Sequence, residues 1–177
     1  MDDDAGFFDR GSWKEHLCEW GKSVFIERGR LGGIPMGAIA VETHLVEMIV
    51  PADPADINSR EAVMPQDGQV LFLDLSYKMA QSLHGFNNEG LPVMIFANWR
   101  GLSGGSREIS GEIIKFGSMI VDALREYEHP IYIYSPPDGE LVEPAINEEK
   151  MTTFSDPEAR GGVLESAGIV EIKFTSW

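Results

Sequence analysis

The stretch Phe-Ala-Asn-Trp-Arg-Gly-Leu-Ser-Gly-Gly, from Phe96 to Gly105, decides the fold because a strand, a glycine turn and a helix meet in it. The apolar run Pro92–Ala97 fits a short strand buried on both faces, as in an α/β arrangement. Glycines in the turn allow backbone angles closed to other residues, and the N–H groups that open the next helix can hold an anion. An ordinary strand-to-helix connection fits the same residues, so a functional site here is a hypothesis.

Helix-like and strand-like segments alternate on both sides of this stretch. Residues 73–86 carry apolar side chains at helical spacing, and a second helix should end at His129-Pro130, before a buried strand at Ile131–Tyr134. The apolar face of that second helix is predicted from Ile109, Ile113, Phe116, Ile120, Leu124 and Tyr127. This alternation is typical of a parallel sheet in an α/β fold.

The N-terminal part is expected to add a helix and a β meander. The capping-box spacing of Ser12 and Glu15 predicts a short helix from Trp13 to Trp20, with its tryptophans facing a core. The link Gly29–Gly33 is expected to be a turn, because it has neither Walker spacing nor a following helix. Strands are predicted at residues 24–27, 34–42 and 45–50.

Later segments are punctuated by turn residues. Residues 51–60 predict an ordered loop in which Asp53 and Asp56 make local turns. Near the C-terminus a short helix is predicted at Asn147–Phe154, and strands are predicted near residues 163–164 and 169–174.

Composition excludes several classes of partner. The chain carries 29 acidic and 14 basic residues, and the resulting formal charge of −15 would repel nucleic acids and anionic membrane surfaces. No apolar run reaches the roughly 18 residues of a membrane span, and the acidic start lacks the basic residues of a targeting peptide. The single cysteine, Cys18, is expected to pack in the interior. We therefore expect a soluble, cytoplasmic protein.

The sequence contains no group of side chains with the spacing that a catalytic site requires. The sequence shows no nucleophile with its base, no metal cluster and no dinucleotide fingerprint, and its histidines stand in different elements. Backbone chemistry remains, because N–H groups around Gly104 and Gly105 can stabilise an oxyanion while Arg100 holds a carboxylate. Such a site suits a reaction through an enolate or another delocalised anion.

Gly117 interrupts the apolar face of the second helix, where glycine costs up to about 1 kcal/mol relative to alanine. Either a neighbouring element packs closely against it, or the helix breaks there and leaves the Gly117 N–H free to donate. The residues alone leave both open, with packing slightly ahead.

Seven short segments stand in the order found in one known family, within a match that runs from about Gly6 to Phe174. They are Arg30-Leu-Gly-Gly-Ile-Pro35, Ala40-Val-Glu-Thr43, Pro51-Ala-Asp-Pro-Ala55, Ala97-Asn-Trp-Arg-Gly101, Ser103-Gly-Gly105, Arg160-Gly-Gly-Val-Leu-Glu165 and Val170-Glu-Ile-Lys-Phe174. The chain resembles the C-terminal half of the carboxyltransferase component of multidomain eukaryotic acetyl-CoA carboxylase. The resemblance implies that the acetyl-CoA-binding N-terminal half of that component is absent from this sequence.

The resemblance implies that residues 1–177 form part of a crotonase-like (ClpP/crotonase) α/β domain, a ββα superhelix. It implies carboxyl transfer from carboxybiotin to acetyl-CoA, giving malonyl-CoA for fatty acid biosynthesis. Decarboxylated biotin itself takes the α-proton in that family, so no side-chain base and no metal are needed. The implied partners are an N-terminal carboxyltransferase half and a biotin carrier domain, in a dimeric assembly.

The resemblance also assigns site residues. Arg100 matches the family arginine that faces the transferred carboxylate, and the turn at Gly104 and Gly105 lies beside the site. Gly117 matches the glycine whose N–H contacts the biotin ureido oxygen, which favours the helix-break interpretation over packing.

The match fails after Leu141, where the family continues with Arg-Gly-Gly-Ser-Trp and a short apolar strand that this chain lacks. That segment supplies N–H groups to a second oxyanion site in the family. Leu102 also replaces a usual phenylalanine at the pocket wall. Two hypotheses follow: a transferase half that is inactive alone, or a non-catalytic domain that binds a biotin carrier or a carboxyltransferase partner.

Overall fold

The computed structural model describes residues 6–137, 142–143, 150–157 and 162–163. The helices in this part are α1 (Leu73–Asn88), α2 (Ser106–Ser110) and α3 (Ile113–Glu126). The strands are β1 (Lys14–His16), β2 (Val24–Leu31), β3 (Ile34–Val41), β4 (Val46–Val50), β5 (Ala62–Gln66), β6 (Val70–Leu71), β7 (Val93–Phe96), β8 (Gly101–Leu102), β9 (Ile131–Ser135), β10 (Val142–Glu143), β11 (Met151–Ser155) and β12 (Gly162–Val163).

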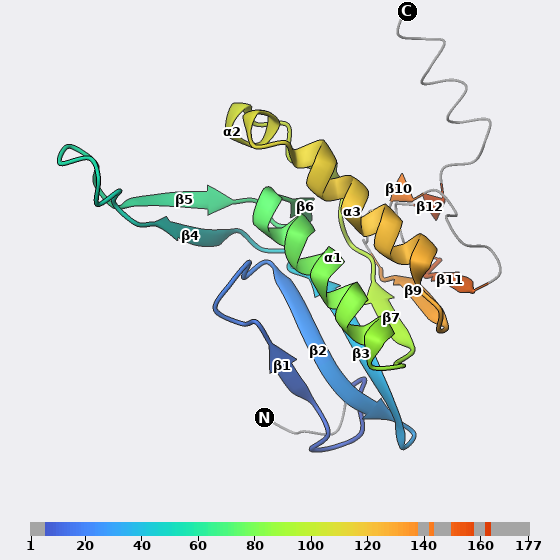
Figure 1. Cartoon of the computed structure of the whole chain (residues 1–177). Coiled ribbons are helices and arrows are strands. Elements are labelled where there is room, and N and C mark those ends of the chain that lie inside the picture. The colour runs from blue at the N-terminus through green and yellow to red at the C-terminus, as the bar shows by residue number, and fades with distance from the viewer. Residues whose placement is uncertain (1–5, 138–141, 144–149, 158–161, 164–177) are drawn as a thin grey trace, which may run out of the picture.

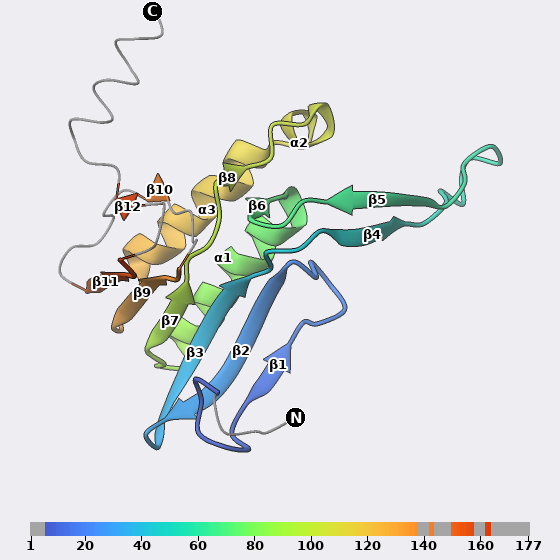
Figure 2. The same cartoon turned by 180° about the vertical axis from the view of Figure 1, so that it is seen from behind.

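A six-stranded sheet with the order β1-β2-β3-β7-β9-β11 forms the centre of the fold. Strands β1, β2 and β3 pair antiparallel, whereas β3, β7, β9 and β11 pair parallel. Helices α1 and α3 lie side by side on one face of the sheet (Figure 1). Figure 2 shows the opposite face, with the strands in front of the helices. The predicted α/β arrangement with parallel strands is confirmed.

The core lies between the sheet and these two helices, and alternate side chains of each strand supply it. The predicted helix over residues 73–86 is confirmed as α1, and the two predicted buried strands are confirmed as β7 and β9. Fully or nearly fully buried core side chains include Val24, Ile26, Ile39, Val93, Ile95, Ile131 and Ile133 from the strands and Leu75, Met79, Leu83, Phe86, Ile120 and Leu124 from the helices.

Helix α1 approaches β3 closely because Gly37 has no side chain. A Cβ built on Gly37 would lie 2.7 Å from atoms of the Phe86 ring, and Phe86 is fully buried. On the same helix Lys78 is also fully buried, and its Nζ donates to the carbonyl oxygens of Gly21 (3.1 Å) and Val24 (2.5 Å). Burial lowers the pKa of Lys78. These contacts fix α1 against β2 and β3.

The β2–β3 hairpin confirms the turn predicted from its glycines. Gly32 and Gly33 both have positive φ, 59° and 84°, as a tight hairpin turn requires. Their N–H groups donate to the two carboxylate oxygens of Asp9, at 2.8 and 2.6 Å. Strand β2 runs to Leu31, further than its predicted end.

The helix predicted from Trp13 to Trp20 is wrong, because β1 occupies this region and pairs with β2. Ser12 does not cap a helix: its Oγ donates to the carbonyl of Asp9 at 2.7 Å and accepts from the Arg30 N–H at 2.9 Å. Trp13 is 54% exposed and does not face a core. Pairing with β2 overrides the local capping signal.

Two further predictions are wrong. Cys18 is exposed rather than packed in the interior. Residues 151–154 of the predicted helix Asn147–Phe154, together with Ser155, form β11, which pairs in parallel with β9, and residues 147–149 lie outside the described part. The late strand near residue 163 corresponds to β12, and the one at residues 169–174 is also outside the described part.

Strands β4 and β5 form an arm that extends away from the sheet (Figure 1). The loop between them confirms the local turns, because the carboxylates of Asp53 and Asp56 accept from the N–H groups of Ala55 and Asn58 at 2.8 and 2.9 Å. The β5 strand was not predicted. The part of the chain described here contains no helix long and apolar enough to cross a membrane.

The close approach at Gly37 yields a prediction about stability. Gly37→Ala should lower the free energy of unfolding by about 1–3 kcal/mol, because the new Cβ overlaps the Phe86 ring. Gly85→Ala is the matched control on α1, where the nearest atom to the new Cβ is 3.9 Å away. It should raise the free energy of unfolding by about 0.5–1 kcal/mol through helix propensity. Urea unfolding measures both, and equal effects would contradict the packing account.

Candidate active site

The predicted site lies at the edge of the sheet where the parallel strands β3, β7 and β9 have their carboxyl ends. Open α/β sheets bind ligands outside this edge. The segment from Ala97 to Gly105 leaves the end of β7 and leads into α2 (Figure 2). The loop that contains the predicted site residues therefore lies at this edge of the sheet.

Pairing with β6 fixes the loop. Strand β8 pairs in parallel with β6, with Val70 opposite Gly101 and Leu71 opposite Leu102. The Ser103 N–H then donates to the Leu71 carbonyl at 2.9 Å. Because β6 immediately precedes α1, the position of the loop follows from the position of that helix. Gly101 has a φ of 148°, which side chains rarely tolerate.

Arg100 is exposed on this loop and is held by Gln69. The Arg100 N–H donates to the Gln69 carbonyl at 2.7 Å, and Arg100 Nη2 donates to Gln69 Oε1 at 3.2 Å. Gln69 Nε2 in turn donates to Oδ1 of the buried Asn98 at 2.6 Å. Sequence reasoning missed Gln69 and Asn98, because nothing in the local pattern connects positions that are distant in the chain.

The turn at Gly104 and Gly105 leads directly into α2. Gly104 is exposed with open space around it, and Gly105 is the N-cap of α2, with extended backbone. The buried Glu108 lies at the same helix start, since a Cβ on Gly105 would be 2.6 Å from Glu108 Oε2. An anion here would meet this carboxylate, and the oxyanion role of the two glycines stays a prediction.

The helix break predicted at Gly117 is wrong. The chain breaks earlier, at Gly111 and Glu112, where Glu112 has a positive φ of 66°, and α3 then continues through Gly117. The N–H of the fifth helical residue points along the helix to the carbonyl four residues before it. The packing interpretation fits instead, since a Cβ on Gly117 would lie 2.6 Å from Leu102 Cδ1.

The structure therefore brings the predicted residues to one corner. Arg100, Gly104 and Gly105 share the loop, and Gly117 contacts Leu102 of that loop from α3. Ile109, predicted on the apolar face of the long helix, belongs instead to α2 and is 64% exposed.

A second network at the same edge surrounds Glu42, at the end of β3. Glu42 Oε1 accepts from the N–H groups of Thr43 and His44 at 2.7 and 3.0 Å, and it lies 2.8 Å from His44 Nδ1. The hydrogen bond from the His44 N–H, followed by those from its ring and from Thr43, lowers the pKa of Glu42. The Glu42 carbonyl accepts from the Gln69 N–H at 2.9 Å, which connects this network to Arg100.

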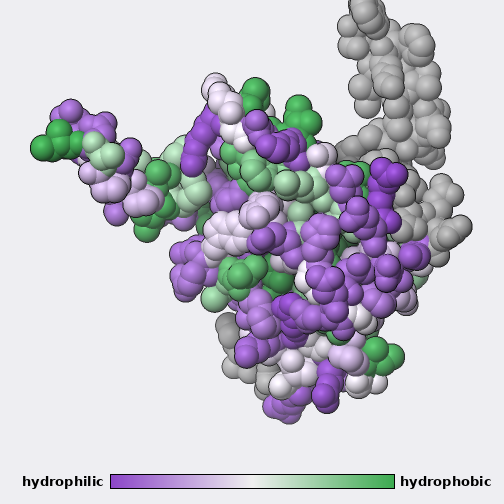
Figure 3. Space-filling view, viewed as in Figure 1, coloured by the Kyte–Doolittle hydropathy of each residue, from purple (hydrophilic) through white to green (hydrophobic). Residues whose placement is uncertain are grey.

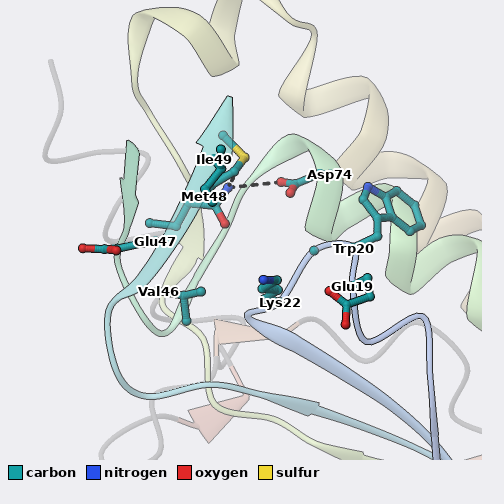
Figure 4. Close-up of a pocket in the computed structure, with 10 residues that line it drawn as sticks. Glu19, Trp20, Lys22, Val46, Glu47, Met48, Ile49 and Asp74 are labelled. Carbon is teal, nitrogen blue, oxygen red and sulfur yellow. Dashed lines mark hydrogen bonds between the residues drawn. The ribbon is translucent and has the colours of Figure 1, made fainter. Parts of the chain in front are cut away.

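A cavity of about 320 Å³ lies elsewhere, between the base of the arm, residues 19–22 and the start of α1 (Figure 4). In it Gln66 Nε2 donates to Asp74 Oδ1 at 3.3 Å. None of the predicted site residues lines this cavity. Arg100 and Gly104, on the loop at the sheet edge, are exposed. No group of three or more possible metal ligands occurs in the described part of the chain.

Comparison with known proteins identifies the family. The pattern of the family described as "Carboxyl transferase domain" matches residues 5–176. The chain belongs to this family. It is 51% identical over 177 residues to acetyl-CoA carboxylase of Saccharomyces cerevisiae strain ATCC 204508 / S288c, and 49% identical over 178 residues to a mitochondrial acetyl-CoA carboxylase of strain YJM789. Each alignment covers 96% of this chain but only 8% of the relative, so the chain spans a small part of these proteins.

The carboxyl transferase fold is also found in a solved structure. The β subunit of geranyl-CoA carboxylase from P. aeruginosa matches 97% of this chain and 30% of its own chain, with a TM-score of 0.63 and 17% identity. This likeness concerns the fold alone, and it confirms the crotonase-like class. The sequence departs from the family after Leu141, where Val142–Glu143 form β10 and residues 144–149 lie outside the described part.

The loop geometry of this carboxyl transferase chain can be tested with a pair of glycine variants. Gly101→Ala should lower the free energy of unfolding by about 1–3 kcal/mol, since its φ of 148° strains any side chain. Gly104→Ala, in open space on the same loop, should change it by less than about 0.5 kcal/mol. Urea unfolding separates the two. A Gly101→Ala variant as stable as Gly104→Ala would contradict the loop conformation.

Proposed function

We propose that this chain is the biotin-side half of an acetyl-CoA carboxyltransferase, which transfers a carboxyl group from carboxybiotin to acetyl-CoA to give malonyl-CoA. The observation that carries the proposal is the 49–51% identity to two acetyl-CoA carboxylases over 96% of this chain. The exposed Arg100 at the carboxyl edge of the sheet supports it.

Arg100 is the residue that would hold the carboxylate. A guanidinium binds a carboxylate through two parallel N–H···O bonds, and this side chain is exposed at the sheet edge. A Cβ built on Gly104 of the same loop would meet nothing within 4 Å, and N–H groups at the start of α2 would face a developing oxyanion. Biotin, when bound, would supply the carboxyl group and the base.

Gly117 fits this proposal as a contact surface rather than as a donor. Its N–H lies within the continuous helix α3, whereas its bare Cα allows Leu102 to lie against the helix. We propose that biotin would contact this corner, with Leu102 as part of the wall.

The partners we propose are a complementary N-terminal carboxyltransferase half and a biotin carrier domain, within a dimer. Exposed apolar side chains support a protein partner, because they gather on the arm and over α2 and the start of α3 (Figure 3). Those with more than half of their surface exposed are Leu45, Ile49, Ile57, Val63, Ile109 and Ile114. The cytoplasm stays our proposed location, although some relatives are named as mitochondrial proteins.

A second candidate is a non-catalytic domain that binds a biotin carrier or a carboxyltransferase partner. One observation favours it: the Glu108 carboxylate already lies at the helix start where an oxyanion would bind. The sequence after Leu141, which lacks the Arg-Gly-Gly segment, points the same way.

Reconstitution decides between the candidates. The chain is mixed with a separately expressed N-terminal half, and malonyl-CoA is followed from carboxybiotin and acetyl-CoA. We expect activity only in the mixture. Arg100→Ala should reduce it about 100-fold, as removal of a transition-state contact does. Arg125→Ala, an exposed arginine in the last turn of α3, should leave it unchanged.

The controls for this experiment establish that both halves are folded and associated. With those controls met, a mixture that forms no malonyl-CoA above background excludes the catalytic proposal and favours the binding domain.

A further inference from the structure

We propose that Gln69 is a positioning residue that fixes the Arg100 guanidinium in one orientation at the carboxyl edge of the sheet. The inference rests on the proposed function for its catalytic consequence, but the contact itself is independent of that function. Its basis is the hydrogen-bond network that connects Gln69 to Arg100, Asn98 and Glu42.

The backbone of Gln69 makes two hydrogen bonds and has a left-handed conformation. Its N–H donates to the Glu42 carbonyl at 2.9 Å, its carbonyl accepts from the Arg100 N–H at 2.7 Å, and its φ is 61°, in the left-handed region. The preceding Gly68 touches the chain after β3 so closely that a Cβ there would lie 2.3 Å from Thr43 backbone atoms. A non-glycine residue is therefore held in a rarely populated conformation, and such conformations gather at functional sites.

The side-chain amide has one orientation that satisfies both neighbours. Nε2 donates to Asn98 Oδ1 at 2.6 Å, while Oε1 accepts from Arg100 Nη2 at 3.2 Å. Turning the amide over would place its NH₂ against the Arg100 NH₂ and its oxygen against the Asn98 oxygen. Asn98 is 6% exposed, so the anchor of this network is buried.

The amide of Gln69 accepts a hydrogen bond from Arg100 without placing a negative charge beside it. Arginine loses much rotamer freedom when it binds a planar group, and a guanidinium that is already oriented loses less. A glutamate at position 69 would also hold the guanidinium but would neutralise it as an ion pair. A glutamine therefore suits a site where Arg100 meets an anionic ligand.

The test uses Gln69→Met, which keeps the length of the side chain and removes both amide bonds. Gln81→Met is the matched control, because exposed Gln81 donates on α1 to the hydroxyl of Tyr77 at 3.0 Å. Gln69→Asn, which tolerates a left-handed backbone, replaces the methionine variant if that variant does not fold.

The first readout is NMR of the Arg100 guanidinium, assigned by comparison with Arg100→Lys. We expect separate, slowly exchanging Nη signals in the unaltered chain and in Gln81→Met, and averaged signals in Gln69→Met. Signals that are averaged in the unaltered chain, or unchanged in Gln69→Met, overturn the proposal.

The second readout is carboxyl transfer by the chain with its complementary half. We expect Gln69→Met to raise the KM for carboxybiotin about tenfold, and Gln69→Glu to raise it further. The Gln69→Met/Arg100→Ala double variant should have the same carboxyl-transfer activity as Arg100→Ala alone. In an active mixture, an unchanged KM or additive losses overturn the positioning role. If the unaltered mixture is inactive, the proposed function fails, and the NMR result alone decides whether Gln69 holds Arg100.

Discussion

The absence of a side chain at Gly37 is the constraint on which the site depends. Phe86 occupies the space above it, so α1 lies directly against β3, and Lys78 secures the same helix to the turn before β2. The start of α1 thereby places β6 at the carboxyl edge of the sheet. Strand β6 pairs with β8 and fixes the loop that carries Arg100. The buried contact between Gly37 and Phe86 thus determines the position of the exposed Arg100.

Arg100 and Gly104 of the candidate site are exposed at this edge. Arg100, Gly104 and Gly117 approach it from one loop and one helix, and exposed apolar side chains continue from α2 onto the arm. A two-stranded hairpin alone is marginally stable in water, and β4 and β5 leave Ile49 and Val63 more than half exposed. Both features are accounted for if a second polypeptide covers this side, which agrees with a chain that spans 8% of its relatives.

Sequence reasoning succeeded where one periodic pattern dominated, as in α1 and in strands β7 and β9. It failed where distant residues decide the structure. Ser12 and Glu15 have capping-box spacing, yet pairing with β2 makes a strand there. The break in the second helical segment falls at Glu112 rather than Gly117, and Gly117 instead packs against Leu102, which is distant in the sequence. The residues of the candidate loop were predictable from their chemistry and resemblance, whereas its support by Gln69 depends on a contact between positions 31 residues apart.

Amide hydrogen exchange tests most directly whether this chain is one half of a divided site. Exchange is measured on the chain alone and with the separately expressed N-terminal carboxyltransferase half. We expect a divided site to show slower exchange on mixing at residues 45–66 and 101–118, and unchanged exchange in the β2–β3 hairpin on the opposite edge. Unchanged exchange in both regions, or protection confined to the β2–β3 hairpin, would contradict it.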